Sequence, residues 1–96
     1  MAKPNEKYEI KSNSSKYIEE GYLKRKEMVE NLNGYRSFTR KEFFSEIAEY
    51  CGVKMSTVSQ IHTRNLTTSY LVSIKISEFL NVPVTKIWEI VEIENN

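Results

Sequence analysis

Cysteine and histidine are almost absent from this chain, and their scarcity excludes several classes of protein. Cys51 is the only cysteine, so no disulfide can form within the chain, and with the single histidine His62 it cannot make a Cys-based metal site. No apolar run approaches the roughly 18 residues of a membrane span, and the opening residues MAKPNEKYEIK lack the hydrophobic region of a signal peptide. The sequence therefore predicts a cytoplasmic protein without a metal or another cofactor.

The sequence contains no recognisable catalytic constellation. We find no paired carboxylates in a predicted pocket and no nucleophile next to a general base. Cys51 is expected to be a small core residue, and His62 is expected to be structural. We therefore predict that the protein is not an enzyme.

The net charge is small, but it is unevenly distributed along the 96 residues of the single domain. Residues 1–36 carry 8 basic and 6 acidic groups, residues 37–75 carry 5 and 3, and residues 76–96 carry 1 and 4. The first two segments are thus +2 each and the last is −3, which sums to the net charge of +1. This asymmetry is compatible with a polyanionic partner but does not require one.

Hydrophobic spacing and capping residues predict an all-α bundle of about five helices. The expected segments are 15–32, from a cap at Thr39 to Gly52, from 55 or 56 to about 62, 69–80, and a last segment, 84–93. Residues 1–14 are polar and Lys-rich and are expected to form a flexible N-terminal arm, with a short edge strand in Lys7–Lys11 as the alternative. Residues 15–96 would then form the folded domain.

The first and fourth helices are predicted from apolar spacing. Ser14 or Ser15 could cap the first helix. The residues expected to face the core are Ile18, Tyr22, Val29 and Leu32, with Met28 beside them, and then Leu71 or Tyr70, Ile74 and Phe79.

The second helix has the clearest start. Thr39 and Glu42 form a capping box, and Phe38 and Phe43 have the spacing of a hydrophobic staple. Gly52 is expected to end the helix in a left-handed conformation, which other residues reach only with strain.

A short helix, a glycine turn and a second short helix make up the skeleton of a helix-turn-helix. Ala48 is small where the second helix would cross close to the first, and Gly52 follows four residues later. Val58 and Ile61 would pack in the interface between the two helices. The region around Gly52 is therefore predicted to be a central helix-turn-helix.

The chain resembles the Cro/repressor-like (XRE-type) helix-turn-helix transcriptional regulators over roughly residues 37–90. The matching positions are Ile47-Ala48, Gly52-Val53, Ser56-Thr57-Val58-Ser59, Ile61, Ser69, Ile74-Lys75-Ile76, Leu80-Asn81-Val82 and Ile87-Trp88. Family members commonly have Gln at the position of Phe44, Glu at His62, Gly at Arg64 and Pro at Thr68. The resemblance implies a lambda-repressor-like bundle that binds double-stranded DNA.

By this resemblance, the helix at residues 55–63 would lie in the major groove. The expected base-contacting residues are Lys54, Met55, Ser56, Ser59, Gln60 and Thr63, and the expected backbone-contacting residues are Arg64, Asn65, Arg40 and Lys41. Gln60 could pair bidentately with adenine, whereas Lys54 could reach either guanine or phosphate.

Regulators of this family usually act as homodimers that read two half-sites. The expected dimerisation residues are Ile87, Trp88, Ile90, Val91 and Ile93, because they cannot all face one small core. In a second arrangement, which the sequence leaves open, Tyr8 and Ile10 pair as an edge strand with this tail.

The sequence thus predicts a sequence-specific DNA-binding regulator, of the repressor type found in phages, plasmids and mobile elements. The alternative is a protein-binding module on the same fold, such as an antirepressor, an antitoxin subunit or a phage-encoded inhibitor. The small net charge, and Phe44 in place of the Gln that is common in the family, favour the alternative. The spacing of the recognition helix favours DNA binding. A regulatory protein partner fits either function, and no membrane partner is expected.

Overall fold

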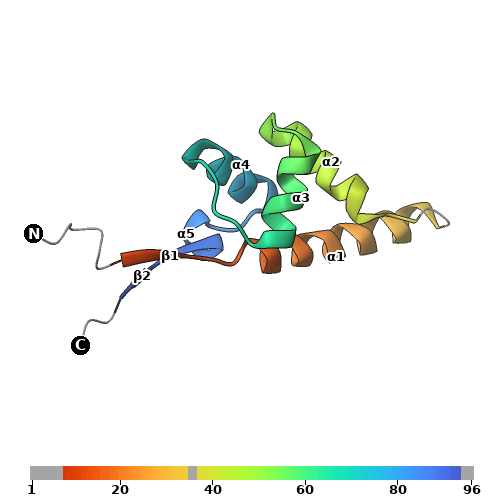
Figure 1. The fold of residues 1–96 in the computed structure, drawn as a ribbon. Helices are drawn as coiled ribbons and strands as arrows, with labels where there is room; N and C mark the ends of the chain where they lie inside the picture. The colour runs from red at the N-terminus through yellow and green to blue at the C-terminus, as the bar shows by residue number, and fades with distance from the viewer. Residues whose placement is uncertain (1–7, 35–36, 94–96) are drawn as a thin grey trace, which may run out of the picture.

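The computed structural model describes residues 8–34 and 37–93, and residues 1–7, 35–36 and 94–96 lie outside this description. The described elements follow in the order β1 (Tyr8–Ser12), α1 (Ser14–Asn33), α2 (Arg40–Cys51), α3 (Met55–Arg64), α4 (Tyr70–Leu80), α5 (Val84–Ile87) and β2 (Trp88–Glu92). The helices form one body, from which β1 and β2 project as a two-stranded ribbon (Figure 1). No helix in these described ranges is long and apolar enough to cross a membrane.

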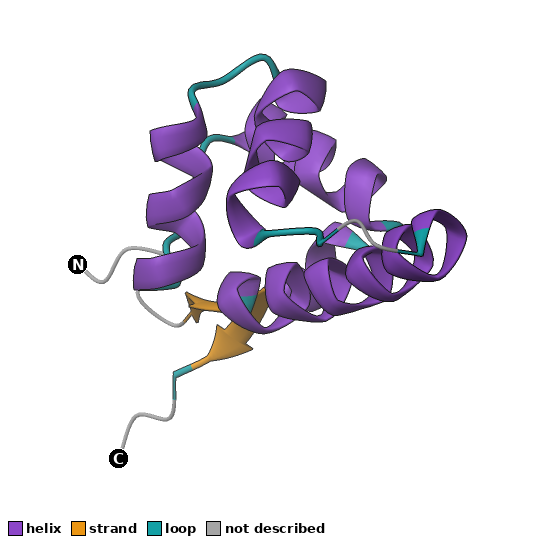
Figure 2. Ribbon diagram, turned by 90° about the vertical axis from the view of Figure 1, so that its right-hand side faces the viewer, coloured by secondary structure: helices purple, strands orange, loops and turns teal. Residues whose placement is uncertain are grey.

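Helix α1 is the longest helix, and α2, α3 and α4 contact it (Figure 2). Ile18, Tyr22 and Val29 are buried at helical spacing, as predicted. Leu32 and Met28 were expected on the same stripe, but their side chains are 79% and 56% exposed. The prediction is wrong for Leu32 because it lies beyond Val29, the last buried residue of α1, and wrong for Met28 because adjacent helix positions are about 100° apart, which places it off the buried stripe.

The start of α1 differs from the predicted cap. Asn13 is the N-cap, without a side-chain hydrogen bond to the helix. Ser14 is fully buried, and its hydroxyl donates to the carbonyl oxygen of Ile61 over 3.1 Å. The Ser15 hydroxyl donates to the carbonyl oxygen of His62. Both serines therefore connect α1 to the end of α3 instead of capping their own helix.

Gly21 lies on the side of α1 that faces Phe43 of α2 and Leu80 of α4. A Cβ atom at this position would be 2.7 Å from Leu80 Cδ2 and 3.2 Å from Phe43 Cζ. Glycine is unfavourable in a helix interior, but here it allows close packing that a larger residue would obstruct.

Helix α2 confirms the local predictions at both of its ends. Thr39 Oγ1 accepts a hydrogen bond from the Glu42 N–H over 3.2 Å. The rings of Phe38 and Phe43 pack edge to face, with centroids 6.3 Å apart. Gly52 is left-handed, with φ 70° and ψ 34°, and ends the helix.

Helix α4 begins as predicted but is rotated relative to the expected stripe. Ser69 caps it by accepting from the amide of Val72, and Ser73 and Ile76 are its buried residues. Tyr70 and Leu71 are 83% and 68% exposed, so their predicted inward orientation is wrong. The Ser73 hydroxyl donates to the carbonyl oxygen of Ser69, so this polar residue can be buried with its hydrogen bond satisfied.

The two strands run antiparallel, with Ile10 opposite Ile90 and Ser12 opposite Trp88. The predicted flexible arm at 1–14 is wrong for residues 8–14, which form β1, the N-cap Asn13 and the first residue of α1. Its first seven residues lie outside the described ones. The open alternative, an edge strand paired with the tail, is the arrangement observed. The fold is therefore mostly helical with a small sheet, rather than all-α.

The tail residues predicted to form a dimer surface are divided between the core and the ribbon. Ile87 and Trp88 are 0% and 7% exposed, and the Trp88 indole N–H donates to the Leu66 carbonyl over 3.1 Å. These two residues therefore belong to the core of a single chain, which corrects the prediction. Ile90 is 71% exposed. The two remaining predicted residues, Val91 and Ile93, are half-buried.

Candidate nucleic-acid interface

Helix α3 is held on the other helices by one apolar face and by contacts near its end. Val58 and Ile61 are 0% and 3% exposed and belong to the common core. The His62 ring packs against Phe44 with centroids 5.1 Å apart, and its Nε2 lies 3.2 Å from Glu19 Oε1. The orientation of α3 is thus fixed by both α1 and α2.

The opposite face of α3 carries the predicted base-contacting residues. Lys54, Met55, Ser56, Gln60 and Thr63 are exposed, and Ser59 is half-buried. At 3.6 residues per turn, the helical members of this set, from Met55 to Thr63, span about 140° of the helix circumference. The structure therefore brings them together on one solvent-facing surface.

A groove of about 360 Å³ separates α2 from the start of α3. Lys41 and Phe44 line it from α2, and Met55, Ser56 and Ser59 line it from α3. Phe44 is only 9% exposed, so it gives the groove an apolar lining. Phe44 stands where XRE-type regulators commonly have Gln, and here it supports α3 through His62 instead of offering a polar contact.

Arg40 was expected to contact a DNA backbone, but its guanidinium is already bound within the chain. It makes two hydrogen bonds to the carboxylate of Glu19, with Nε 3.0 Å from Oε1 and a second bond from Nη2 to Oε2. The guanidinium also lies 4.7 Å from the centre of the Tyr22 ring. These hydrogen bonds hold the pKa of Glu19 below its ordinary value, with a smaller contribution from the hydrogen bond of His62. Arg40 thus connects α2 to α1, and its predicted contact with a DNA backbone stays a prediction.

Asn65 was also expected to grip a DNA backbone, and it too is engaged within the chain. Its Nδ2 donates to the Ser12 carbonyl over 2.6 Å, and its Oδ1 accepts from the Ser15 amide over 3.1 Å and from the Ser14 hydroxyl over 3.2 Å. Asn65 is left-handed, with φ 53°, and ends α3. The side chain therefore joins the end of α3 to β1 and α1.

Three cations border the exposed face of α3. Lys41, Lys54 and Arg64 are exposed, and none of them forms an ion pair with another residue in the described ranges. Lys54 is the N-cap of α3 and makes no side-chain hydrogen bond to the first turn. The first amides of α3 lack intrahelical acceptors, and such a helix start favours anions.

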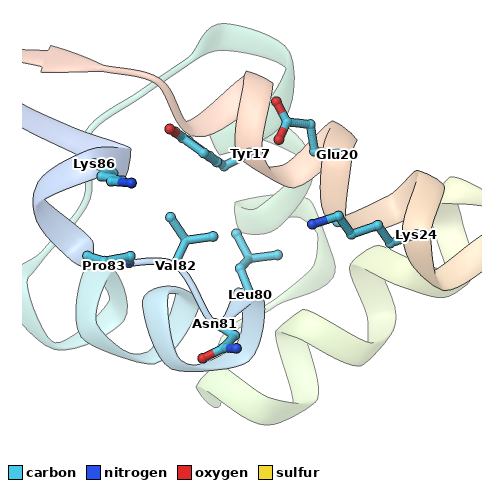
Figure 3. A pocket seen from close by; sticks show the side chains of 9 residues that line it. Tyr17, Glu20, Lys24, Leu80, Asn81, Val82, Pro83 and Lys86 are labelled. Atoms are coloured by element: carbon cyan, nitrogen blue, oxygen red, sulfur yellow. The ribbon is translucent and has the colours of Figure 1, made fainter.

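Another hollow, of about 230 Å³, lies between α1 and the turn that leads from α4 to α5 (Figure 3). Its labelled lining residues are Tyr17, Glu20, Lys24, Leu80, Asn81, Val82, Pro83 and Lys86. It shares no lining residue with the α2–α3 groove and contains none of the predicted site residues.

The only thiol does not form part of a reactive site. Cys51 is half-buried, and burial raises the pKa of its thiol, so it stays protonated near neutral pH. Within the described residues, no three His, Cys, Asp or Glu side chains are grouped so that they could hold a metal ion.

Sequence reasoning missed the contacts that orient α3. Neither Glu19 nor Phe44 was in the predicted site, although both touch His62. Glu19 is 43 residues away from His62, so no local spacing could have revealed the pair.

Comparisons with protein-family models, curated protein sequences and solved structures found no match.

Proposed function

We propose that the chain is a sequence-specific DNA-binding transcriptional regulator of the XRE type, acting as a repressor. In this proposal, α2, the Gly52 turn and α3 form a helix-turn-helix, and α3 enters the major groove. The observation that carries the proposal is the exposed polar face of α3, which lies opposite the buried pair Val58 and Ile61. A surface set rigidly on a packed core suits base readout, because its side chains are held in position before binding.

The exposed residues of α3 suit direct readout of bases. Gln60 offers a donor and an acceptor that match N7 and N6 of adenine, and the hydroxyls of Ser56, Ser59 and Thr63 can donate or accept. The Met55 side chain can contact a thymine methyl group. Each good bidentate pair contributes about 1–3 kcal/mol of discrimination between bases.

Backbone contacts are assigned to Lys41, Lys54 and Arg64, which form no ion pair with another described residue. They border the α3 face, and the start of α3 adds amide donors for a phosphate. Arg40 and Asn65 are left out of this set because their side chains are engaged with Glu19 and Ser12. This reduced set predicts a moderate salt dependence of binding.

The test is selection of binding duplexes from a random pool, followed by affinity measurements at several salt concentrations. Gln60→Ala is expected to weaken binding to the selected site by about 5- to 150-fold, which corresponds to about 1–3 kcal/mol, and to relax the preference at one position of each half-site. Arg64→Ala is expected to weaken all duplexes similarly and to lower the salt slope by about 1.

Two substitutions on α1 serve as matched controls. Asn31→Ala removes an exposed amide and Lys24→Ala removes an exposed cation, both from a helix outside the proposed interface. Neither should alter the affinity or the preferred sequence. Selection without enrichment, with all binding lost at moderate salt, would contradict the proposal.

A protein-binding module on the same fold is the second candidate. It is supported by the exposure of Tyr70 and Leu71 at the start of α4, where two neighbouring large apolar side chains face solvent. The alternative predicts that Tyr70→Ser/Leu71→Ser abolishes binding to the partner and that the duplex selection enriches no sequence. If DNA is the target, this double variant should bind the selected duplex as the wild type does.

A further inference from the structure

Among the residues that the structure describes, strand β1 has one edge without a partner strand. In the sheet that the structure describes, β1 pairs with β2 alone. Just beyond the strand, the Asn13 N–H donates to the Ile87 carbonyl over 2.6 Å, in line with the register of the ladder. Hydrogen-bonded and non-hydrogen-bonded pairs alternate in an antiparallel ladder, so Lys11 and Glu9 direct their backbone groups towards β2.

The backbone groups of Tyr8, Ile10 and Ser12 consequently point away from β2. The Ser12 carbonyl fits this assignment, because it accepts the Asn65 Nδ2 hydrogen bond from outside the sheet. Asn65 therefore covers the edge at Ser12, whereas Tyr8 and Ile10 keep outward N–H and C=O groups. An edge of this kind is a template for another strand.

The same ribbon exposes apolar side chains on one face. Directly opposite residues of an antiparallel pair lie on the same face, so Ile10 and Ile90 are neighbours there, with Tyr8 two residues further along. Their exposed fractions are 57%, 71% and 50%. A two-stranded ribbon is marginally stable in water on its own, so further pairing would stabilise it.

The charges of β1 are complementary to those of a second β1. Glu9 and Lys11 flank Ile10. When two antiparallel copies place Ile10 opposite Ile10, each Glu9 lies opposite the other copy's Lys11. Two-fold registers centred on Glu9 or on Lys11 would instead place like charges opposite each other, which is destabilising. The β2 edge offers no such match, because its charged residues, Glu89 and Glu92, are both acidic.

We propose that the chain forms a homodimer by antiparallel pairing of β1 with β1 of a second copy, with the two Ile10 residues opposite each other. The result is a four-stranded sheet with β2 on both outer edges, and its apolar face is lined by Ile10 and Ile90 of both copies. The proposal rests on the proposed function in one respect, that a regulator which reads two half-sites binds them as a dimer. It places the interface on β1 instead of on the buried tail residues Ile87 and Trp88.

The test is the mass of the full chain in solution without DNA, measured by sedimentation equilibrium over a range of concentrations. The wild type is expected to reach twice the chain mass. Glu9→Lys places the introduced lysine opposite Lys11 of the other copy, and we expect the dissociation constant of this variant to rise at least tenfold.

A complementary variant supplies the rescue. Lys11→Glu alone would place two acids opposite each other within one ribbon, because Lys11 faces Glu89. We therefore combine Lys11→Glu with Glu89→Lys, which keeps opposite charges within the chain. This double variant should also dissociate, since Glu9 would face the glutamate introduced into β1 of the other copy. An equimolar mixture with Glu9→Lys is expected to form the heterodimer, which also shows that both variants fold.

A backbone substitution tests the edge separately from the charges. Ile10→Pro removes an N–H that points away from β2, so it should leave β1–β2 pairing intact but prevent dimerisation. Ile10→Thr keeps that N–H and should dimerise more tightly than Ile10→Pro. Circular dichroism checks that both variants are folded.

The outcomes separate this inference from the proposed function. A wild type that stays monomeric at all concentrations, or a dimer that Glu9→Lys leaves intact, overturns the β1 interface even if a DNA sequence is selected. A dimer that follows the charge-swap pattern supports the interface even if the duplex selection fails.

Discussion

At the scale of single residues, Gly52 determines how α3 leaves α2. Its backbone is in the left-handed region, with φ 70°, and its N–H donates hydrogen bonds to the carbonyl oxygens of Ala48 and Glu49. A Cβ at this position would meet no atom within 4 Å. The requirement for glycine therefore comes from backbone conformation and not from lack of space.

Replacing Gly52 by alanine is expected to lower the free energy of unfolding by about 1–2 kcal/mol, the cost of placing an L-residue in the left-handed region. Gly52→Asn should cost less, because asparagine adopts this conformation more readily. Urea unfolding of the three proteins measures both differences. Equal stabilities would show that the turn tolerates a side chain without strain.

Residue-level prediction succeeded for backbone conformation and missed side-chain contacts between residues distant in sequence. The left-handed Gly52 and the Thr39 cap follow from local chemistry, which a few neighbouring residues specify completely. Arg40 and Asn65 are exposed as a DNA-contacting surface would require, but their side chains bind Glu19 and Ser12. Such partners are distant in sequence, so exposure alone could not reveal that these two residues are already engaged.

At the scale of elements, the end of α3 is attached to β1 and α1 through Asn65. Asn65→Asp keeps the size of the side chain but replaces the Nδ2 donor with an oxygen that faces the Ser12 carbonyl. We expect the free energy of unfolding to fall by about 1–3 kcal/mol, because a hydrogen bond is lost and two acceptors are left facing each other.

Asn81→Asp is the matched control for this substitution. Asn81 ends α4 with φ 55°, close to the 53° of Asn65, but its side chain makes no hydrogen bond to a described residue. Its replacement should change stability by less than about 0.5 kcal/mol. If chemical denaturation shows the same decrease in the free energy of unfolding for both variants, the hydrogen bonds of the Asn65 side chain do not stabilise the fold.

Elements defined by local signals were predicted best. The bounds of α2 and the cap of α4 agree with the structure, because capping and turn chemistry act within a few residues. The β1–β2 ribbon joins residues about 80 positions apart in the chain, and the polar, Lys-rich composition around its alternating pattern favoured an arm over a strand. The α3 surface was predicted from helical spacing around Val58 and Ile61, whereas the groove lined by Phe44 required the packing of α2 on α3.

At the scale of the whole molecule, one carboxylate joins three helices. Glu19 of α1 accepts hydrogen bonds from Arg40, the first residue of α2, and lies beside His62 of α3. The same group therefore helps to fix the helix that carries the proposed DNA-contacting face. Its protonation should affect both stability and the orientation of α3.

The pH dependence of stability follows from the lowered pKa of Glu19, which arises mainly from the hydrogen bond of Arg40. A folded-state pKa below the unfolded value means that the unfolded chain binds more protons, so this contribution is fully present above the ordinary value of 4.5. It is lost as the pH falls below that value and through the folded pKa. Glu19→Gln removes the titration, so its stability should fall less steeply than that of the wild type between pH about 6 and about 3.

Glu30 provides the comparison, because its pKa is also lowered, by Lys26 and by the Phe38 amide, but it does not touch α3. Glu30→Gln should likewise flatten the acid side of the stability curve, whereas only Glu19→Gln should also reduce the affinity for the selected duplex at neutral pH. Urea unfolding across this pH range, together with duplex binding, separates the two carboxylates. If Glu19→Gln leaves DNA affinity unchanged while it destabilises the fold, the three-helix contact supports stability without setting the orientation of α3.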